Sequence, residues 1–310
     1  MAQEVQAVTR RSRLHGALRD MWKKRMAYVM ITPYMLIFLT FTVVPVIVSM
    51  ILSFTQYNVL QSPVFVGLRN YTNLFVNDEV FAIAVRNTVI FALVTGVVGY
   101  ALSFFVAWAI NELSKGVRAV LTFIFYAPTI SGTVYTIWSI IFNGDMYGYA
   151  NSLLLRLGLI SSPIDWFTTD AYILPMIILV QLWMSMGAGF LTLRAGMSSV
   201  DAQLYEAGAI DGVKNRFQEL WYITVPQMAP HMMTAAVLQI TSMFASTQVS
   251  ISLAGFPSTN YAGHLVMTHL MDYSNYRLER GYACAIAVLM FLFMIAINQT
   301  VLKFLRKVGG

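Results

Sequence analysis

Charged side chains are scarce in this chain of 310 residues. Only 11% of the residues are Asp, Glu, Lys or Arg, and 58% are hydrophobic. A soluble domain carries about 25% charged and about 45–50% apolar residues. The composition therefore excludes an ordinary soluble protein and predicts an integral membrane protein.

Residues that commonly perform catalysis or bind metals are also few. The single cysteine, Cys284, excludes an intrachain disulfide and makes thiol chemistry improbable. No glycine-rich phosphate loop follows a strand, and no His/Cys cluster has the spacing of a metal site. We therefore expect no catalytic residue, no metal and no cofactor in this chain. The four histidines are scattered: His15, His231, His264 and His269.

What the sequence does contain is six long apolar runs. Each is long enough to cross about 30 Å of hydrocarbon as a helix, and none contains Asp, Glu, Lys or Arg. The predicted fold is all-α, a polytopic membrane protein with six transmembrane helices. The predicted spans are 27–54, 88–110, 119–142, 171–193, 229–254 and 282–302.

Positive charges are distributed unevenly between the connections. Fifteen Lys and Arg residues precede the first span, follow the last, or lie in the second and fourth connections; five lie on the other side. By the positive-inside rule, both termini and the fourth connection are predicted to be cytoplasmic.

This distribution divides the chain into three parts. Residues 1–26 form a basic cytoplasmic arm, 27–302 the six-helix domain, and 303–310 a basic tail. The run that follows the arm is too long for a signal-peptide core, so we expect an uncleaved span. The basic arm is expected to face anionic membrane lipid, and no nucleic acid partner is expected.

The absence of Asp, Glu, Lys and Arg from the predicted spans indicates what kind of solute could cross the membrane here. Carriers coupled to protons or sodium usually need buried carboxylates, so this chain is not expected to be one. Amides, hydroxyls and an aromatic ring suit a neutral sugar. Such groups also bond helices to each other in membranes. They lie in the fourth and fifth spans and include Gln181, Trp183, Ser185, Gln239, Thr241, Ser242 and Ser246.

One polar segment, residues 198–226, interrupts the apolar runs. A helix is expected to begin near Asp201 and to end at Asp211-Gly212, because glycine tolerates the positive φ of a helix end. A second helix is expected to end at Pro226. The apolar residues of this helix fall on one face of a 3.6-residue period: Val213, Phe217, Leu220, Trp221 and Val225.

The 198–226 segment resembles the EAA motif of the permease subunits of bacterial ABC importers. The similarity rests on Glu206-Ala207-Gly208, Gly212 and Ile223-Thr224-Val225-Pro226. Gly208 stands where the family usually has alanine, which is expected to weaken the helix by about 1 kcal/mol. The resemblance implies a coupling helix that docks on an ATPase through Tyr205, Glu206, Ala207, Gly208, Asp211 and Gly212.

Further short motifs resemble the carbohydrate class of these permeases, similar to the maltose and oligosaccharide subunits. They occur in the family's order: Gly67-Leu68-Arg69-Asn70-Tyr71, Asn87-Thr88, Gly148, Asn151, Gly158, Trp166 and Gly281-Tyr282-Ala283.

The resemblance implies a subunit that forms half of a sugar pathway and is not itself an enzyme. Its implied partners are a second homologous permease, an ABC ATPase dimer that binds ATP and Mg, and an extracytoplasmic solute-binding protein. The implied substrate-binding positions, taken together with Gln181, are Trp183, Ser185, Thr241, Ser242 and Ala245.

Two alternatives remain. The same architecture could carry another solute such as glycerol 3-phosphate, although a phosphate favours a basic residue in the pathway and the predicted spans have none. A membrane-embedded transferase would need His264, His269 and Asp272 to cluster, yet the two histidines are five residues apart, a poor spacing for one helical face.

Overall fold

The computed structural model describes residues 25–308 except residue 133; the side chains of Ala245 and of residues 306–308 are also outside the described part. The fold is helical, as predicted, apart from a hairpin of two-residue strands, β1 (Thr55–Gln56) and β2 (Val64–Phe65), which pair antiparallel. Because the described residues begin at residue 25, most of the predicted 1–26 arm lies outside them.

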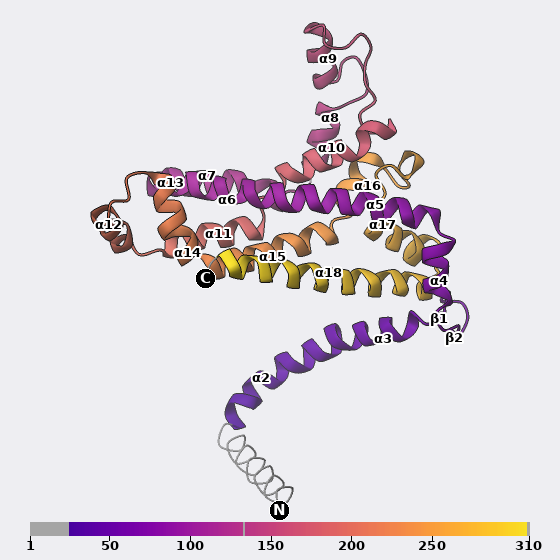
Figure 1. Ribbon diagram of the computed structural model, residues 1–310. Coiled ribbons are helices and arrows are strands. Elements are labelled where there is room, and N and C mark those ends of the chain that lie inside the picture. Colours follow the sequence, from indigo (N-terminus) through magenta and orange to yellow (C-terminus); the bar gives the residue numbers. More distant parts are fainter. Residues whose placement is uncertain (1–24, 133, 309–310) are drawn as a thin grey trace, which may run out of the picture.

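The first apolar run forms a nearly continuous helix. It consists of α2 (Arg25–Phe38), the π-helical turn η1 (Leu39–Val43) and α3 (Val44–Leu52), close to the predicted 27–54. Helix α3 packs against α18 (Arg280–Val308), whereas α2 leaves the bundle and buries none of its residues (Figure 1).

The second span begins nine residues earlier than predicted, because Asp78 caps the helix by accepting from the Phe81 amide at 2.8 Å. It comprises α5 (Glu79–Leu93), η2 (Val94–Val98) and α6 (Gly99–Asn111). Its first turns thus include Glu79 and Arg86, so the absence of charge holds for the apolar stretch but not for the whole helix.

The third and fifth runs are each broken. The third is α7 (Lys115–Ile130) and α8 (Val134–Ile141), bent by 86°, and the fifth is α15 (Ala229–Ala245) and α16 (Gln248–Ala254), bent by 41°. Within residues 25–308, four helices are long and apolar enough to cross a membrane, and six result if each bent pair forms one span. The chain is a multi-pass membrane protein.

The fourth run contains α10 (Asp170–Trp183) and α11 (Ala188–Ser199). It continues past the predicted end at residue 193, so Arg194 lies inside the helix and only 9% of its surface is exposed. The helix is therefore longer than the predicted span and includes one basic residue that the prediction placed in the following connection.

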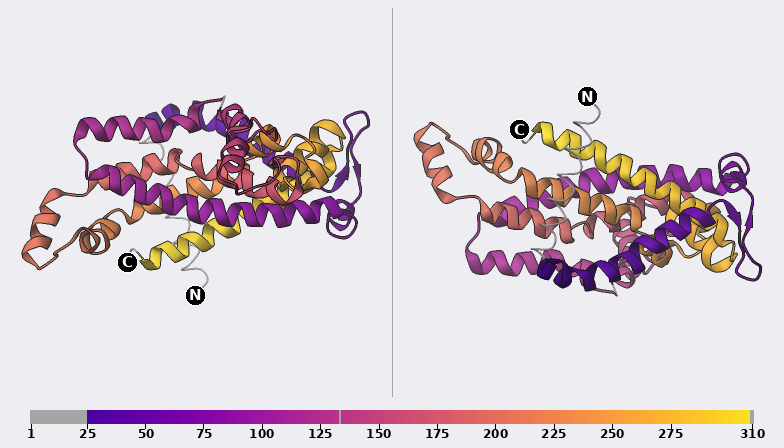
Figure 2. Two further views of the ribbon diagram at one scale, coloured as in Figure 1. Left: turned by 90° about the horizontal axis from the view of Figure 1, so that it is seen from above. Right: turned by 90° about the horizontal axis from the view of Figure 1, so that it is seen from below.

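The bundle has two different ends (Figures 1 and 2). At one end lies the 198–226 segment, with α12 (Ala202–Ile210), α13 (Arg216–Glu219), η3 (Leu220–Thr224) and α14 (Val225–Gln227). The other end carries what we call the distal cap: α4 (Arg69–Val76), η4 (Thr259–Tyr261), α17 (Val266–Met271), η5 (Asp272–Tyr276) and the first turns of α5 and α18. A short helix, α9 (Tyr149–Arg156), projects beyond α8 (Figure 1).

Candidate coupling and translocation sites

Helix α12 projects from the bundle and exposes nearly all of its side chains (Figure 1). Asp201 caps it by accepting from the Gln203 amide at 3.0 Å. Glu206, Ala207 and Ile210 are exposed, Ile210 to 87%. An apolar side chain of that size fully in water is unfavourable, so this helix presents a surface suited to a partner.

Two residues of α12 face the chain that returns to the bundle. The Tyr205 hydroxyl lies 2.9 Å from the Thr224 hydroxyl, and Gly208 is buried against Ile223. A Cβ added at Gly208 would lie 2.6 Å from Ile223 Cδ1. Gly208 therefore does more than weaken the helix, because its missing side chain lets Ile223 pack there.

Gly212 ends α12 as predicted. Its φ is +94°, in the region that favours glycine, and no atom lies within 4 Å of where its Cβ would be. The Asp211 amide donates to the Ala207 carbonyl at 3.0 Å, and the Val213 amide to the Gly208 carbonyl at 2.9 Å. Gly212 thus sets the direction of the chain and is free of packing constraints.

The predicted single apolar face of the second helix was wrong. Leu220 and Val225 are buried, but Phe217 and Trp221 are each 60% exposed. The reason is η3, whose π-helical turn holds more residues than an α-turn and so rotates the residues on either side of it away from a common face. The Phe217 ring nevertheless lies 5.4 Å from that of Trp108 on α6, which ties the segment to the bundle.

The two helices that enter and leave the 198–226 segment pack closely. Gly189 of α11 approaches Ala235 of α15, where an added Cβ would lie 3.1 Å from the Ala235 carbonyl oxygen. Gly196 lies against His231, with 2.7 Å between the added Cβ and the His231 Cβ. Small residues allow helices in a membrane to approach in this way, so α11 and α15 are in close contact beside the segment that joins them.

Several predicted polar residues do meet between α10 and the α15–α16 break. Gln181 is buried, and its side-chain oxygen accepts from the Ser246 hydroxyl at 3.3 Å. Its side-chain nitrogen lies 3.7 Å from the Met243 sulfur. The break leaves backbone polar groups to be satisfied in the membrane, which is tolerated where the chain is buried or lines a cavity.

Two further buried polar side chains, Ser185 and Gln239, lie beside Gly99. Ser185 and Gln239 are 2% and 4% exposed, and the Ser185 hydroxyl and the Gln239 amide nitrogen have no hydrogen-bond partner among the described residues. An added Cβ at Gly99 would lie within 3.1 Å of both side chains. Gln239 was noted in the sequence but not selected, and the signal that finds it is this unpartnered amide.

The remaining predicted positions are more exposed. Trp183 is 42% exposed and stacks edge-on against Trp138 at 5.3 Å, and Thr241 and Ser242 are exposed on α15. The side chain of Ala245 lies outside the described residues. The structure thus buries Gln181, Ser185 and Gln239, with Ser246 half-buried beside Gln181, and leaves Trp183, Thr241 and Ser242 more exposed.

The motif residues near the distal end are structural in this fold. Asn87 donates to the carbonyls of Tyr261, Ala262 and His264, and the Thr88 hydroxyl accepts from the Val266 amide at 2.9 Å. Asn70 donates to the carbonyls of Ser53 and Thr55 at 2.8 and 2.9 Å. Asn151 likewise donates to four carbonyls of the loop around α9: Asn143, Gly144, Asp145 and Ile164.

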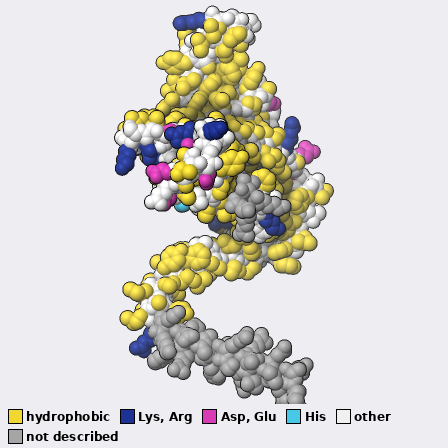
Figure 3. Space-filling view, turned by 60° about the vertical axis from the view of Figure 1, so that its left-hand side comes forward, with side chains coloured by type: hydrophobic (Ala, Val, Ile, Leu, Met, Phe, Trp, Pro, Cys, Tyr) yellow, Lys and Arg dark blue, Asp and Glu magenta, His cyan; other side chains and the backbone are white. Residues whose placement is uncertain are grey.

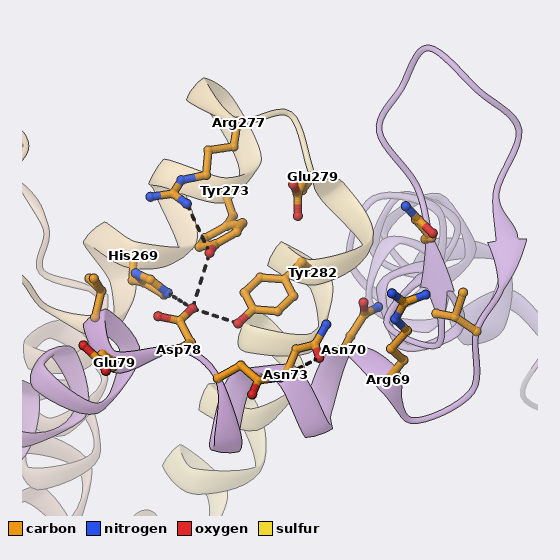
Figure 4. Close-up of a pocket in the computed structure, with 14 residues that line it drawn as sticks. Arg69, Asn70, Asn73, Asp78, Glu79, His269, Tyr273, Arg277, Glu279 and Tyr282 are labelled. Atoms are coloured by element: carbon orange, nitrogen blue, oxygen red, sulfur yellow. Dashed lines mark hydrogen bonds and ion pairs between the residues drawn. The ribbon is translucent and has the colours of Figure 1, made fainter.

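The distal cap also contains a chain of titratable groups beside a polar cavity of about 540 Å³ (Figure 4). Asp78 accepts from His269 Nε2 at 3.0 Å and from the hydroxyl of Tyr282 at 2.8 Å. His269 Nδ1 lies 3.3 Å from His264 Nε2. The expectation that the two histidines would not meet was wrong, because the short helix α17 folds back toward the preceding turn.

Burial sets the protonation of this cluster. It lowers the pKa of His264 to about 4 and also lowers the pKa of His269, against the attraction of Asp78. Burial by itself would raise the pKa of Asp78, but hydrogen bonds from the Phe81 amide, Tyr282 and His269 bring that pKa below its ordinary value. Asp272 instead pairs with Arg277 at 2.8 Å, so the carboxylate beside the two histidines is Asp78.

Comparisons with known proteins agree with this architecture. A protein family described as "binding-protein-dependent transport system inner membrane component" matches residues 99–308. The chain is 33% identical to the probable ABC transporter permease protein YesP of Bacillus subtilis over 89% of both chains. It is 29% identical to the arabinooligosaccharides transport system permease protein AraP of the same organism, over 92% of this chain and 90% of AraP.

A solved structure has the same fold. It is a bacterial alginate ABC transporter in complex with an alginate pentasaccharide-bound periplasmic protein, and one of its chains matches 94% of this chain and 97% of its own length at 22% identity and a TM-score of 0.77. The extent of the family match, together with these relatives, shows that the chain belongs to the inner-membrane components of binding-protein-dependent transport systems.

Proposed function

We propose that this chain is the permease subunit of an ATP-driven importer and forms half of the pathway for a neutral oligosaccharide. The observation that carries the proposal is the group of uncharged polar side chains between α10 and α15, which α11 connects to the projecting α12. Relatives named for oligosaccharide transport support a sugar as the solute.

Gln181, Ser185, Gln239 and Ser246 are proposed to bind the solute, because amides and hydroxyls both donate to and accept from sugar hydroxyls. The Ser185 hydroxyl and the Gln239 amide nitrogen have no hydrogen-bond partner among the described residues, so both are available to bind a ligand. Trp183 is proposed to pack its ring against the sugar ring, with Thr241, Ser242 and Ala245 further along the pathway.

The 198–226 segment is proposed to be the coupling element. Its exposed residues Glu206, Ala207, Asp211 and Gly212 would contact an ATPase dimer, which binds ATP and Mg, whereas Tyr205 and Gly208 hold α12 against Thr224 and Ile223. Closure of the dimer would then move α11 and α15 through this contact, and with them the polar side chains between α10 and α15.

This role requires six spans with both termini and the 198–226 segment in the cytoplasm. The bent pairs α7–α8 and α15–α16 are each proposed to act as one broken span. Charged side chains gather on the 198–226 end, whereas most of the remaining surface in view is hydrophobic (Figure 3). A second homologous permease and an external solute-binding protein complete the proposed assembly.

The test is co-expression of this chain with the ATPase, permease and binding-protein subunits encoded by neighbouring genes, followed by purification through a tag on this chain. We expect a stable complex whose ATP hydrolysis is stimulated by the sugar-loaded binding protein. Full sugar uptake by this chain without any ATPase would overturn the proposal. Cysteine labelling at residue 210 from the cell exterior would overturn the topology.

A further inference from the structure

A basic pocket lies between α7 and α11, near the end of the bundle that carries the 198–226 segment. It has a volume of about 530 Å³ and is lined by Lys115, Arg118 and Arg194, with the hydroxyls of Tyr126 and Ser198. Three cations on one pocket repel each other. A pocket of this charge is suited to an anion.

Arg194 is the buried part of this pocket. Only 9% of it is exposed, and its Nη1 donates to Asn111 Oδ1 at 2.9 Å and to the Ser198 hydroxyl at 2.7 Å. Both partners are neutral, and its Nε is buried without a hydrogen-bond partner among the described residues. A buried guanidinium normally has an anionic partner. Its planar set of N–H donors matches the geometry of a phosphate group.

No acidic side chain supplies that partner within the described residues. Asp201, the acid nearest to Arg194 in sequence, caps α12. Glu112, in the α6–α7 connection, pairs with Arg216 at 3.3 Å. Arg118 donates to the backbone carbonyls of Asn111 and Leu113, which fixes its position at the end of α6. Lys115 is exposed at the mouth and makes no ion pair or hydrogen bond in the described chain.

The remaining wall of the pocket is apolar. Phe123 and Leu191 line it with Ala119 and Ala195, and Phe123 is 66% exposed on the outside of the bundle. A free inorganic ion would make no favourable contact with this apolar wall. An amphiphile could instead bind the arginines through an anionic headgroup and pack its hydrocarbon chain along Phe123. Basic pockets between membrane helices are suited to acidic lipid headgroups.

We propose that this pocket binds the phosphate of an anionic phospholipid, with an acyl chain along Phe123. Arg194 and Lys115 contact the phosphate oxygens, and Arg118 adds charge while it holds the α6–α7 connection. The lipid supplies the anion that Arg194 lacks within the described part of the chain. This proposal is independent of the solute that is transported.

The test is native mass spectrometry of the full-length chain in its purified complex, with phosphatidylglycerol titrated against phosphatidylcholine. We expect phosphatidylglycerol to remain bound preferentially. Lys115→Gln should weaken retention about fivefold, since one cation near the surface is lost, and Arg194→Gln should weaken it further. Lys303→Gln, an exposed cation on α18 outside this pocket, is the matched control and should change nothing.

Free phosphates separate the two possible sources of the anion. Inorganic phosphate and glycerol 3-phosphate, added at the concentration that saturates with phosphatidylglycerol, should not displace the lipid. Displacement at that concentration would overturn the lipid in favour of a free phosphate compound. Unchanged retention in Lys115→Gln, which is at the mouth and leaves the helix packing intact, would overturn the site itself.

Discussion

The distal cap and the 198–226 segment differ in how they satisfy their own polar groups. In the cap, Asn87 alone serves three backbone carbonyls, and Asp78 is held by an amide, a histidine and a tyrosine. In the 198–226 segment, α12 leaves Glu206, Ala207 and Ile210 exposed. The cap satisfies its polar groups within this chain, whereas the segment leaves most of α12 exposed.

The difference has a physical basis in burial. A buried donor or acceptor without a partner costs about 1–3 kcal/mol, so the cap must be fully bonded in the free chain. Exposed groups are satisfied by water and are free to exchange it for a partner. Function that depends on a partner is thus expected at the segment, and stability at the cap.

The largest expected effect comes from changing Gly212 to Val. At φ +94° a β-branched residue is strained, at a cost of about 1–2 kcal/mol. Relief of this strain would change the backbone angles at residue 212 and with them the direction of α12. We expect stimulation of ATP hydrolysis by the loaded binding protein to be lost in the reconstituted complex, while membrane insertion stays normal.

Gly158 supplies the matched control for this change. It has φ +70° and open space around its Cβ position, but follows α9, far from α12 (Figure 1). Gly158→Val should pay a similar strain and leave the stimulation intact. Equal loss of stimulation in both variants would show that strain in general, rather than the direction of α12, is responsible.

A smaller effect on activity but a large one on stability is expected for Asn87→Ala. One buried and two half-buried carbonyls lose their donor, so we expect about 3 kcal/mol of destabilisation, measured by thermal or denaturant unfolding in detergent. Asn77→Ala is the control, because its exposed amide only bonds to Asn73, and it should cost under about 0.5 kcal/mol. Equal costs would refute the assignment of Asn87.

The cap should also lose stability in mild acid. His264 has a folded pKa of about 4 against 6.5 for the unfolded chain, so the unfolded chain binds more protons between these values. Stability is therefore full above pH 6.5 and falls toward pH 4, by about 2 kcal/mol at pH 4.5 for His264. His264→Gln should flatten the unfolding profile over that window; an unchanged slope would place the titration elsewhere.

The smallest effect is expected for Arg216→Ala. Its guanidinium pairs with Glu219 at 2.7 Å and with Glu112 at 3.3 Å, but its side chain is 64% exposed. Exposed ion pairs contribute less than about 1 kcal/mol. We expect a change in unfolding free energy under about 0.5 kcal/mol, and a loss comparable to that of Asn87→Ala would mean that the 198–226 segment is anchored as firmly as the cap.

Sequence patterns gave the apolar runs and the turn at Gly212 because these depend on local properties. Hydrophobic length decides which stretches cross a membrane, and positive φ decides where glycine is needed. The same reasoning missed the early start of α5, because a single cap at Asp78 extends a helix beyond its apolar stretch.

What the sequence by itself determined is therefore a helical membrane protein with an exposed polar segment between two of its runs. Only the tertiary structure decided that His264 meets His269, that Ser185 and Gln239 both lie beside Gly99, and that Arg194 is buried without an acidic partner within the described residues. These contacts join residues from different helices or across a fold-back, and their formation depends on how the helices pack rather than on spacing along the chain.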